Sequence, residues 1–78
     1  MDKEYRTSEM GLVAALVSLG YKIEKLENIS HNKVEFVFDN KKQIEEVEDA
    51  YWRDELNVNA RTYFDNVKML KSRIRSNK

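Results

Sequence analysis

The basic residues near the C-terminus have a spacing that could bind anions. Arg61, Lys68 and Arg75 are seven residues apart, and Lys71 falls at the edge of the same helical face. On a helix the first three form a nearly axial row about 21 Å long. A row of this length can follow several phosphates of DNA or RNA. Two other interpretations stay open, namely the solvated face of an amphipathic helix and a surface for an acidic protein partner.

Trp52 and the adjacent Arg53 form a second candidate contact. At 100° per residue, Trp52 would lie beside the apolar stripe of its helix rather than within it. Tryptophan and arginine are both enriched at protein interfaces. Trp52 therefore either covers a junction between two helices or anchors a partner.

Four neighbouring acids, Glu45, Glu46, Glu48 and Asp49, could offer carboxylates to Mg²⁺ or Ca²⁺. Glu45 and Asp49 share one helix face. These residues flank an apolar stripe, however, and that arrangement is typical of a solvated outer face.

Residues suited to catalysis are sparse. The single histidine, His31, is expected in a turn and has no second metal ligand at a matched spacing. The serines lack a histidine that could act as their base. Gly11 and Gly20 are too far apart for a phosphate-binding loop. We therefore expect no enzymatic activity, no metal and no cofactor.

The composition bounds the class of protein. A chain of 78 residues allows one domain, here 1–78, and the absence of cysteine excludes disulfides and cysteine-based zinc sites. No apolar run approaches the roughly 20 residues of a membrane span. The first residues also lack the apolar stretch of a signal peptide. The sequence predicts a cytoplasmic protein with no membrane contact and a short frayed tail at 76–78.

Charge is unevenly distributed, although the net charge is zero. Residues 35–57 hold eight acids and three bases, whereas residues 58–78 hold one acid and six bases. Such a chain either neutralises its two regions within one fold or remains dipolar. A dipolar chain could associate head to tail or offer its basic end to an anionic partner.

The first half of the chain predicts a strand, a helix and a hairpin. Residues 4–7 are β-prone, and Thr7 or Ser8 is a candidate helix cap. The next segment is apolar all round, as in a buried helix, and Gly20 is expected to end it. Residues 21–29 and 33–38 alternate as an antiparallel hairpin, with Asn32 suited to left-handed φ in the turn and a bulge near 24–25.

The second half predicts two helices. Asp39 or Asn40 caps the first, in which Ile44, Val47 and Tyr51 recur at helical spacing. A second stripe runs from Ala60 to Ile74, and on one continuous helix the two stripes would point about 160° apart. We therefore expect a break, with Asn57 as a left-handed stop, Asn59 as N-cap and Val58 with Tyr63 as a hydrophobic staple. The rival is one unbroken helix whose four-three spacing from Trp52 onward forms a seam for a second chain.

Three stretches carry a resemblance to a known family: "YRTSEMGLVAALVSLGY", "VEFVFDN" and "YWRDELNVNARTYFDNVKMLKSRI". They resemble a small domain of unknown function found in bacterial and phage genomes. The resemblance implies an α+β fold and a phage or mobile-element setting, with no assigned activity and no functional residue to carry over.

Together these observations predict an α+β domain: a short N-terminal strand, a buried helix, a β-hairpin, and two C-terminal helices packed on a small antiparallel sheet. The expected function is a non-enzymatic accessory interaction domain, with nucleic-acid binding by the basic helix as the alternative. Its partner is an unidentified protein, a second copy of the chain, or nucleic acid. The candidate contacts are Trp52, Arg53, Arg61, Lys68, Lys71 and Arg75.

Overall fold

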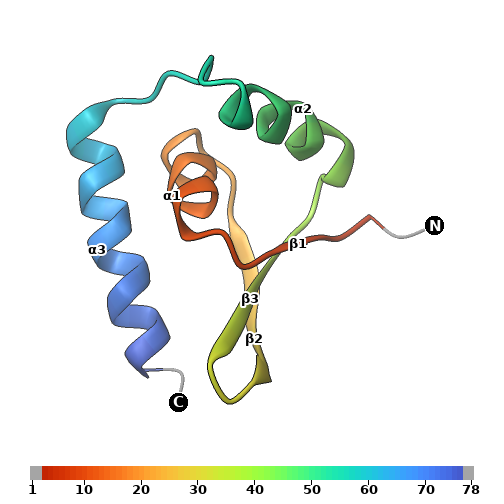
Figure 1. The fold of residues 1–78 in the computed structure, drawn as a ribbon, viewed down its shortest axis with the longest axis vertical. Coiled ribbons are helices and arrows are strands. Elements are labelled where there is room, and N and C mark those ends of the chain that lie inside the picture. Colours follow the sequence, from red (N-terminus) through yellow and green to blue (C-terminus); the bar gives the residue numbers. More distant parts are fainter. Residues whose placement is uncertain (1–2, 77–78) are drawn as a thin grey trace.

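The computed structural model describes residues 3–76 and has the predicted α+β architecture (Figure 1). The order of elements is β-α-β-β-α-α, as expected from the sequence. Ser76, assigned to the frayed tail, is the last residue of the final helix, and 77–78 lie outside the described residues. The elements are β1 (Tyr5–Thr7), α1 (Met10–Ser18), β2 (Ile23–Ser30), β3 (Lys33–Phe38), α2 (Lys41–Trp52) and α3 (Ala60–Ser76).

The three strands form one antiparallel sheet in the order β1-β3-β2. The register shifts between Ile23 and Lys25, which confirms the bulge predicted there. A second shift, between Asn28 and Ser30, was not predicted. Left-handed φ at Asn32 was also wrong, because Asn40 and Asp54 are the only non-glycine residues with positive φ within the described range.

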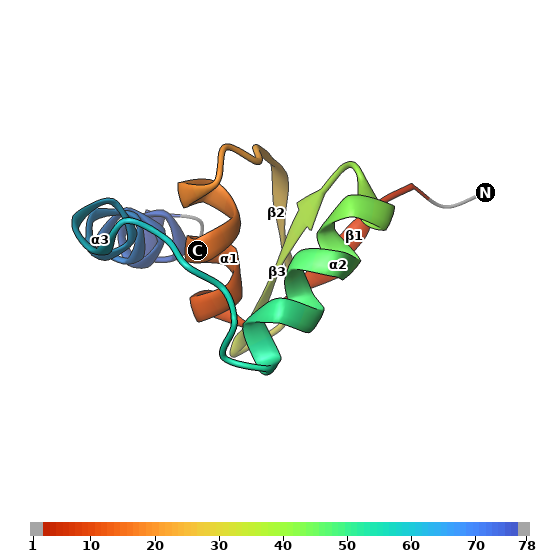
Figure 2. The ribbon, with the colours of Figure 1, turned by 90° about the horizontal axis from the view of Figure 1, so that it is seen from above.

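The helix α1 is buried on every side, as its apolar sequence predicts. Its residues 12–16 are all buried. It lies between α3 on one side and the sheet and α2 on the other, an arrangement seen from two directions in Figures 1 and 2. A helix with neighbours on opposite sides can be apolar all round, because its central residues are removed from water on every face.

The two ends of α1 differ in how well they were predicted. The N-cap is Glu9 rather than Thr7 or Ser8, and the Thr7 hydroxyl instead accepts a hydrogen bond from the Glu9 N–H at 3.1 Å. Gly20 ends the helix with φ of 103°, as expected. The N–H of Tyr21 donates to the carbonyl of Leu16 and that of Gly20 to Val17, each at 3.0 Å. This pair of bonds is a Schellman motif.

The chain does break between α2 and α3, so the continuous-helix alternative was wrong. The stop itself is at Asp54, with φ of 60°, and not at Asn57. Glu55 N–H donates to Ala50 at 2.9 Å and Asp54 N–H to Tyr51 at 3.2 Å, which repeats the Schellman pattern seen after α1. At the start of α3, the Asn59 side chain accepts from the Thr62 N–H at 3.0 Å, which confirms Asn59 as N-cap.

At the start of α2 the cap position was predicted but its chemistry was not. Asn40 is the N-cap, yet its side chain makes no capping hydrogen bond and its backbone is left-handed. The Asp39 carboxylate instead accepts from the Asn40 N–H at 2.9 Å. The N–H of Lys41 donates to the carbonyl of Lys3 at 3.2 Å, so the N-terminal segment supplies part of the cap.

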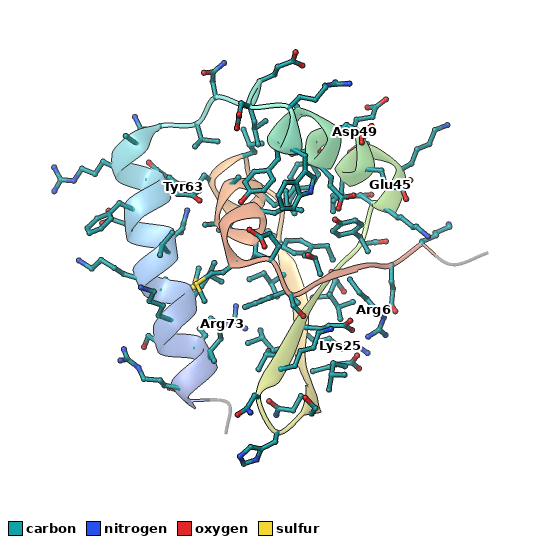
Figure 3. All side chains as sticks on the ribbon, viewed as in Figure 1. Arg6, Lys25, Glu45, Asp49, Tyr63 and Arg73 are labelled. Carbon is teal, nitrogen blue, oxygen red and sulfur yellow. The ribbon has the colours of Figure 1, made fainter. Side chains whose placement is uncertain are left out.

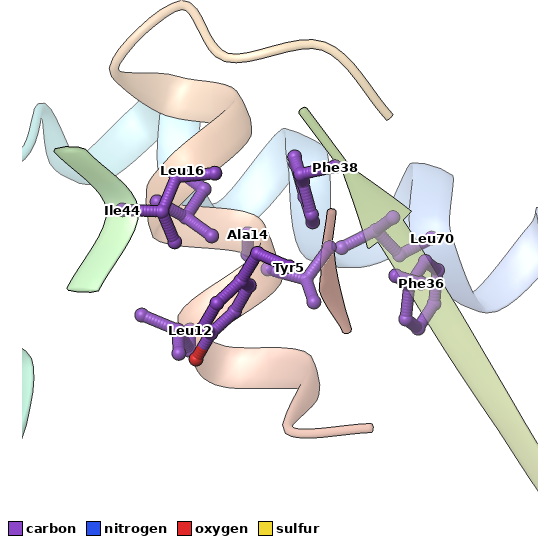
Figure 4. Packing of buried hydrophobic residues seen from close by; sticks show 9 residues of the cluster. Tyr5, Leu12, Ala14, Leu16, Phe36, Phe38, Ile44 and Leu70 are labelled. Carbon is purple, nitrogen blue, oxygen red and sulfur yellow. The ribbon is translucent and has the colours of Figure 1, made fainter. Parts of the chain in front are cut away.

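Side chains from five elements meet in one core (Figure 4). The β3 residues Phe36 and Phe38 point into it, and Ile44 of α2 and Leu70 of α3 join it from opposite sides of α1 (Figure 4). Within residues 3–76 all but one of the tyrosines and phenylalanines are buried or half-buried. Phe64 is the exception, since this residue is 61% exposed. The buried cluster consists of Tyr5, Leu12, Val13, Ala14, Leu16, Phe36, Phe38, Ile44 and Leu70.

The other face of the sheet carries an ion-pair network centred on Arg6. Its guanidinium contacts Glu27 of β2 and lies 3.7 Å from Glu35 of β3, so it joins all three strands. The register places Arg6 and Lys25 on either side of Val37, which is fully buried although it is not part of the core cluster. Long aliphatic stems such as those of arginine and lysine can cover an apolar neighbour while their charged ends stay in water.

Candidate interaction surfaces

The inner face of α3 packs against α1 and uses two side-chain hydrogen bonds to fix its position. The Tyr63 hydroxyl donates to the Gly11 carbonyl at 3.2 Å. The Asn66 amide donates to the Ser18 hydroxyl at 3.0 Å, and that hydroxyl donates to Ala14 at 2.7 Å. Leu70 is buried one turn further along. These contacts determine which face of α3 packs against α1 and which face is exposed to solvent.

The outward face of α3 carries the predicted basic row. Arg61, Lys68, Lys71 and Arg75 are all exposed. None of the ion pairs found within residues 3–76 involves a cation of α3. Asp65, on the same helix, therefore does not neutralise the row by direct pairing.

Phe64 lies within this basic face. It is spaced three residues from Arg61 and four from Lys68, so the three share one side of the helix. The Lys68 ammonium lies 5.2 Å from the Phe64 ring centroid, within cation–π range. Aromatic residues and arginine are both enriched in protein interfaces relative to the rest of the surface, so this face has the composition of an interface.

Trp52 and Arg53 are exposed but do not join the basic row. Trp52 is 62% exposed, and its ring meets that of Tyr51 edge-on, with 5.0 Å between ring centroids. Arg53 pairs with Glu55 at 3.1 Å. Because α1 lies between α2 and α3, the outward face of α3 points away from the α2 helix that carries Trp52 (Figures 1 and 2). The sequence-predicted contacts therefore form two surfaces.

Trp52 does not cover the helix junction either. A groove of about 280 Å³ marks that junction. Val58 and Tyr63, the predicted staple pair, both line it, in agreement with their expected proximity. The residues around the groove are Ala15, Tyr51, Asp54, Leu56, Val58 and Tyr63.

Three of the four acidic residues of α2 are exposed, and the fourth is half-buried. Glu45, Glu46 and Asp49 are exposed, and Figure 3 shows Glu45 and Asp49 on the side of the molecule remote from α3. Glu48 is half-buried and accepts a hydrogen bond from the Tyr5 hydroxyl. Burial, reinforced by this bond, raises the pKa of Tyr5. Within residues 3–76 no three acidic or histidine side chains are grouped so as to hold a metal ion.

Tyr51 ties the end of α2 to the start of α1. Its hydroxyl donates to the Glu9 carboxylate at 3.0 Å. Burial, with this hydrogen bond and the Glu9 charge, raises the pKa of Tyr51 to about 12. Gly11 lies where the Tyr51 and Tyr63 hydroxyls converge, and a Cβ at that position would overlap the Tyr51 hydroxyl.

Two surface features were missed by sequence reasoning. The exposure of Phe64 had a usable signal, because the residue falls three positions after Arg61 and four before Lys68 and so shares the basic face. The Arg6 network had none, because Arg6, Glu27 and Glu35 are brought together only by the strand register.

The architecture is that of a small α+β domain without a recognisable catalytic constellation in its described part. The chain belongs to the family described as Domain of unknown function (DUF5659), whose model matches residues 2–76. This agrees with the resemblance found in the sequence. Comparison with curated proteins found no match, and comparison with solved structures found none either. Within residues 3–76 no helix is both long and apolar enough to cross a membrane.

Proposed function

We propose that this protein is a non-enzymatic interaction domain whose binding surface is the outward face of α3 and whose ligand is an anionic partner. The observation that carries the proposal is the row Arg61, Lys68, Lys71 and Arg75, exposed and without a carboxylate partner in the described structure. Unpaired cations on a rigid helix attract anions and steer their approach.

The way α3 is held supports this proposal. Its inner face is fixed by Tyr63, Asn66 and Leu70, so the outward face is presented in one orientation. Phe64 adds exposed apolar surface to the same face. A charged surface with a central aromatic can supply both steering and desolvated contact area.

Nucleic acid is the second candidate ligand. The same row could follow phosphates, and Phe64 could stack on an unpaired base, as aromatic side chains do in single-strand-binding proteins. The nearby Asp65 carboxylate argues against close approach of a phosphate backbone along the whole row.

A non-enzymatic role is consistent with the position of His31, which lies exposed in the hairpin turn.

We place the protein in the cytoplasm and in a phage or mobile-element setting as parts of the same proposal. The identity of the neighbouring genes tests that setting directly, because a chromosomal housekeeping context would contradict it.

The experiment measures binding of two polyanions, poly-L-glutamate and double-stranded DNA, each at two salt concentrations. Charge reversal of Arg61, Lys68 and Arg75 to glutamate should weaken binding at least about tenfold and flatten its salt dependence. The matched control is Lys33→Glu, an exposed cation of the hairpin. Equal affinity of the wild-type and row-reversed proteins for both probes, or no binding at low salt, would overturn the proposal.

A further inference from the structure

A second charged strip, of opposite sign, runs along α2. Glu45, Asp49 and Trp52 are spaced four and three residues apart, so they lie on one side of the helix. Glu45 and Asp49 are exposed and make no ion pair with any residue in the described range. Trp52, also exposed, ends the strip with apolar surface. We call this the acidic strip.

The basic strip on α3 has the same construction with the sign reversed. It consists of Arg61, Phe64, Lys68, Lys71 and Arg75, which recur at three- and four-residue intervals. Each strip therefore combines like charges, on an element held in place by core contacts, with one large exposed aromatic: Trp52 at 62% and Phe64 at 61%.

The two strips cannot neutralise each other within one molecule. The helix α1 lies between α2 and α3, and no ion pair joins the two helices in the part of the chain that is described (Figures 1 and 2). The chain nevertheless carries no net charge, since its acids and bases are equal in number. Every copy of the chain therefore presents one strip of each sign, and a second copy offers each strip a surface of opposite charge.

We infer that the partner of the basic strip is the acidic strip of a second copy of this chain. This inference rests on the proposed function, since it names the anionic partner of the same α3 surface. In the contact, Lys68 and its neighbours face Glu45 and Asp49, while Trp52 and Phe64 supply the apolar part. Opposite charges across such a contact set the register and disfavour pairing of like strips.

The placement of the strips predicts the form of the assembly. Because the contact joins different surfaces of the two copies, it is heterologous and leaves one acidic and one basic strip free at the ends. A single helix against a single helix buries little area, so association is weak, detectable at about 0.1 mM and above. Further copies can add at either end, and the mean mass rises with concentration instead of stopping at a dimer.

The test is sedimentation velocity across a concentration range, at low and high salt, with two reversed variants. Variant A carries Arg61→Glu, Lys68→Glu and Arg75→Glu, and variant B carries Glu45→Lys and Asp49→Lys. All five positions are exposed, so circular dichroism should show an unchanged fold. Wild type should associate at low salt and dissociate at high salt. Each variant alone should be monomeric, because both of its strips have the same sign. A mixture of A and B should associate, because the intact acidic strip of A meets the intact basic strip of B, and the reversed α3 of A meets the reversed α2 of B.

Two controls make the outcome decisive. Lys33→Glu and Glu24→Lys change charge on exposed hairpin positions outside both strips and should associate as wild type does. Wild type that stays monomeric at every concentration and at low salt overturns the inference. Association that survives in A or B also overturns it, since another surface must then be responsible. Row-dependent binding of poly-L-glutamate or DNA by a strictly monomeric wild type would keep the proposed function and reject this partner.

Discussion

Asp54 occupies a backbone position at which glycine would be less strained. Its φ of 60° is left-handed, and it holds the same place after α2 that Gly20 holds after α1. An aspartate tolerates this conformation better than most residues, but glycine adopts it without a Cβ clash. The residue sets where α2 ends and hence where the chain turns toward α3.

We expect Asp54→Gly to raise the free energy of unfolding by about 0.5–1 kcal/mol, because it removes left-handed strain. Asp54→Ala should lower it by a similar amount, about 1 kcal/mol, since alanine keeps the Cβ and lacks the local polar group. Urea denaturation of the three proteins measures both changes. A glycine variant less stable than wild type would contradict the strain argument.

At the scale of elements, the three helices meet at Gly11. The Tyr63 hydroxyl reaches its carbonyl from α3, and the Tyr51 hydroxyl from α2 occupies the space a side chain would need. Glycine within a helix costs about 1 kcal/mol relative to alanine. Here the missing side chain lets the Tyr51 and Tyr63 hydroxyls approach the helix backbone.

Gly11→Ala should therefore destabilise the protein by about 1 kcal/mol, because overpacking of about 1–3 kcal/mol outweighs the gain in helix propensity. In a Tyr51→Phe background the hydroxyl is gone and the penalty should shrink by at least about 0.5 kcal/mol. Urea unfolding of the two single variants and the double variant provides the cycle. Additive effects would show that Tyr51 does not occupy the Gly11 notch.

For the whole molecule, the pKa shifts predict loss of stability at both ends of the pH scale. The hydrogen bond from Arg6 lowers the pKa of Glu27 below its ordinary 4.5, so its contribution is complete above that pH and is lost as pH falls further. Tyr51 has its pKa raised from 10.0 to about 12, so its contribution is complete below pH 10 and is lost toward pH 12.

Unfolding midpoints measured from pH 2 to 12 should show both losses. Arg6→Gln should reduce the fall of the unfolding midpoint at low pH (the acid limb of the curve), since it removes the group that stabilises the Glu27 carboxylate. It should leave the fall at high pH (the alkaline limb) unchanged. Tyr51→Phe should make the alkaline limb shallower and leave the acid limb unchanged. An acid limb that is identical in wild type and Arg6→Gln would show that the sheet network contributes nothing measurable.

Much of the fold follows from local features of the sequence. The all-round apolar pattern of 12–16 predicted a buried helix, and the phase of two apolar stripes predicted the break before Asn59. Gly20 correctly predicted the end of α1, because glycine adopts the positive φ of a helix stop without strain. These predictions succeeded because periodicity, capping and left-handed φ depend on residues close together in the chain.

Other features were decided only when distant segments came together. The Arg6 network depends on strand register, because its partners Glu27 and Glu35 lie on two other strands. The sequence alone determined that an acidic segment, 35–57, and a basic segment, 58–78, balance each other, since the first holds eight acids and three bases and the second one acid and six bases. Only the tertiary structure decided that α1 separates them, because contacts through Tyr51, Tyr63 and Asn66 hold one helix on each side of it and leave both charged strips facing solvent.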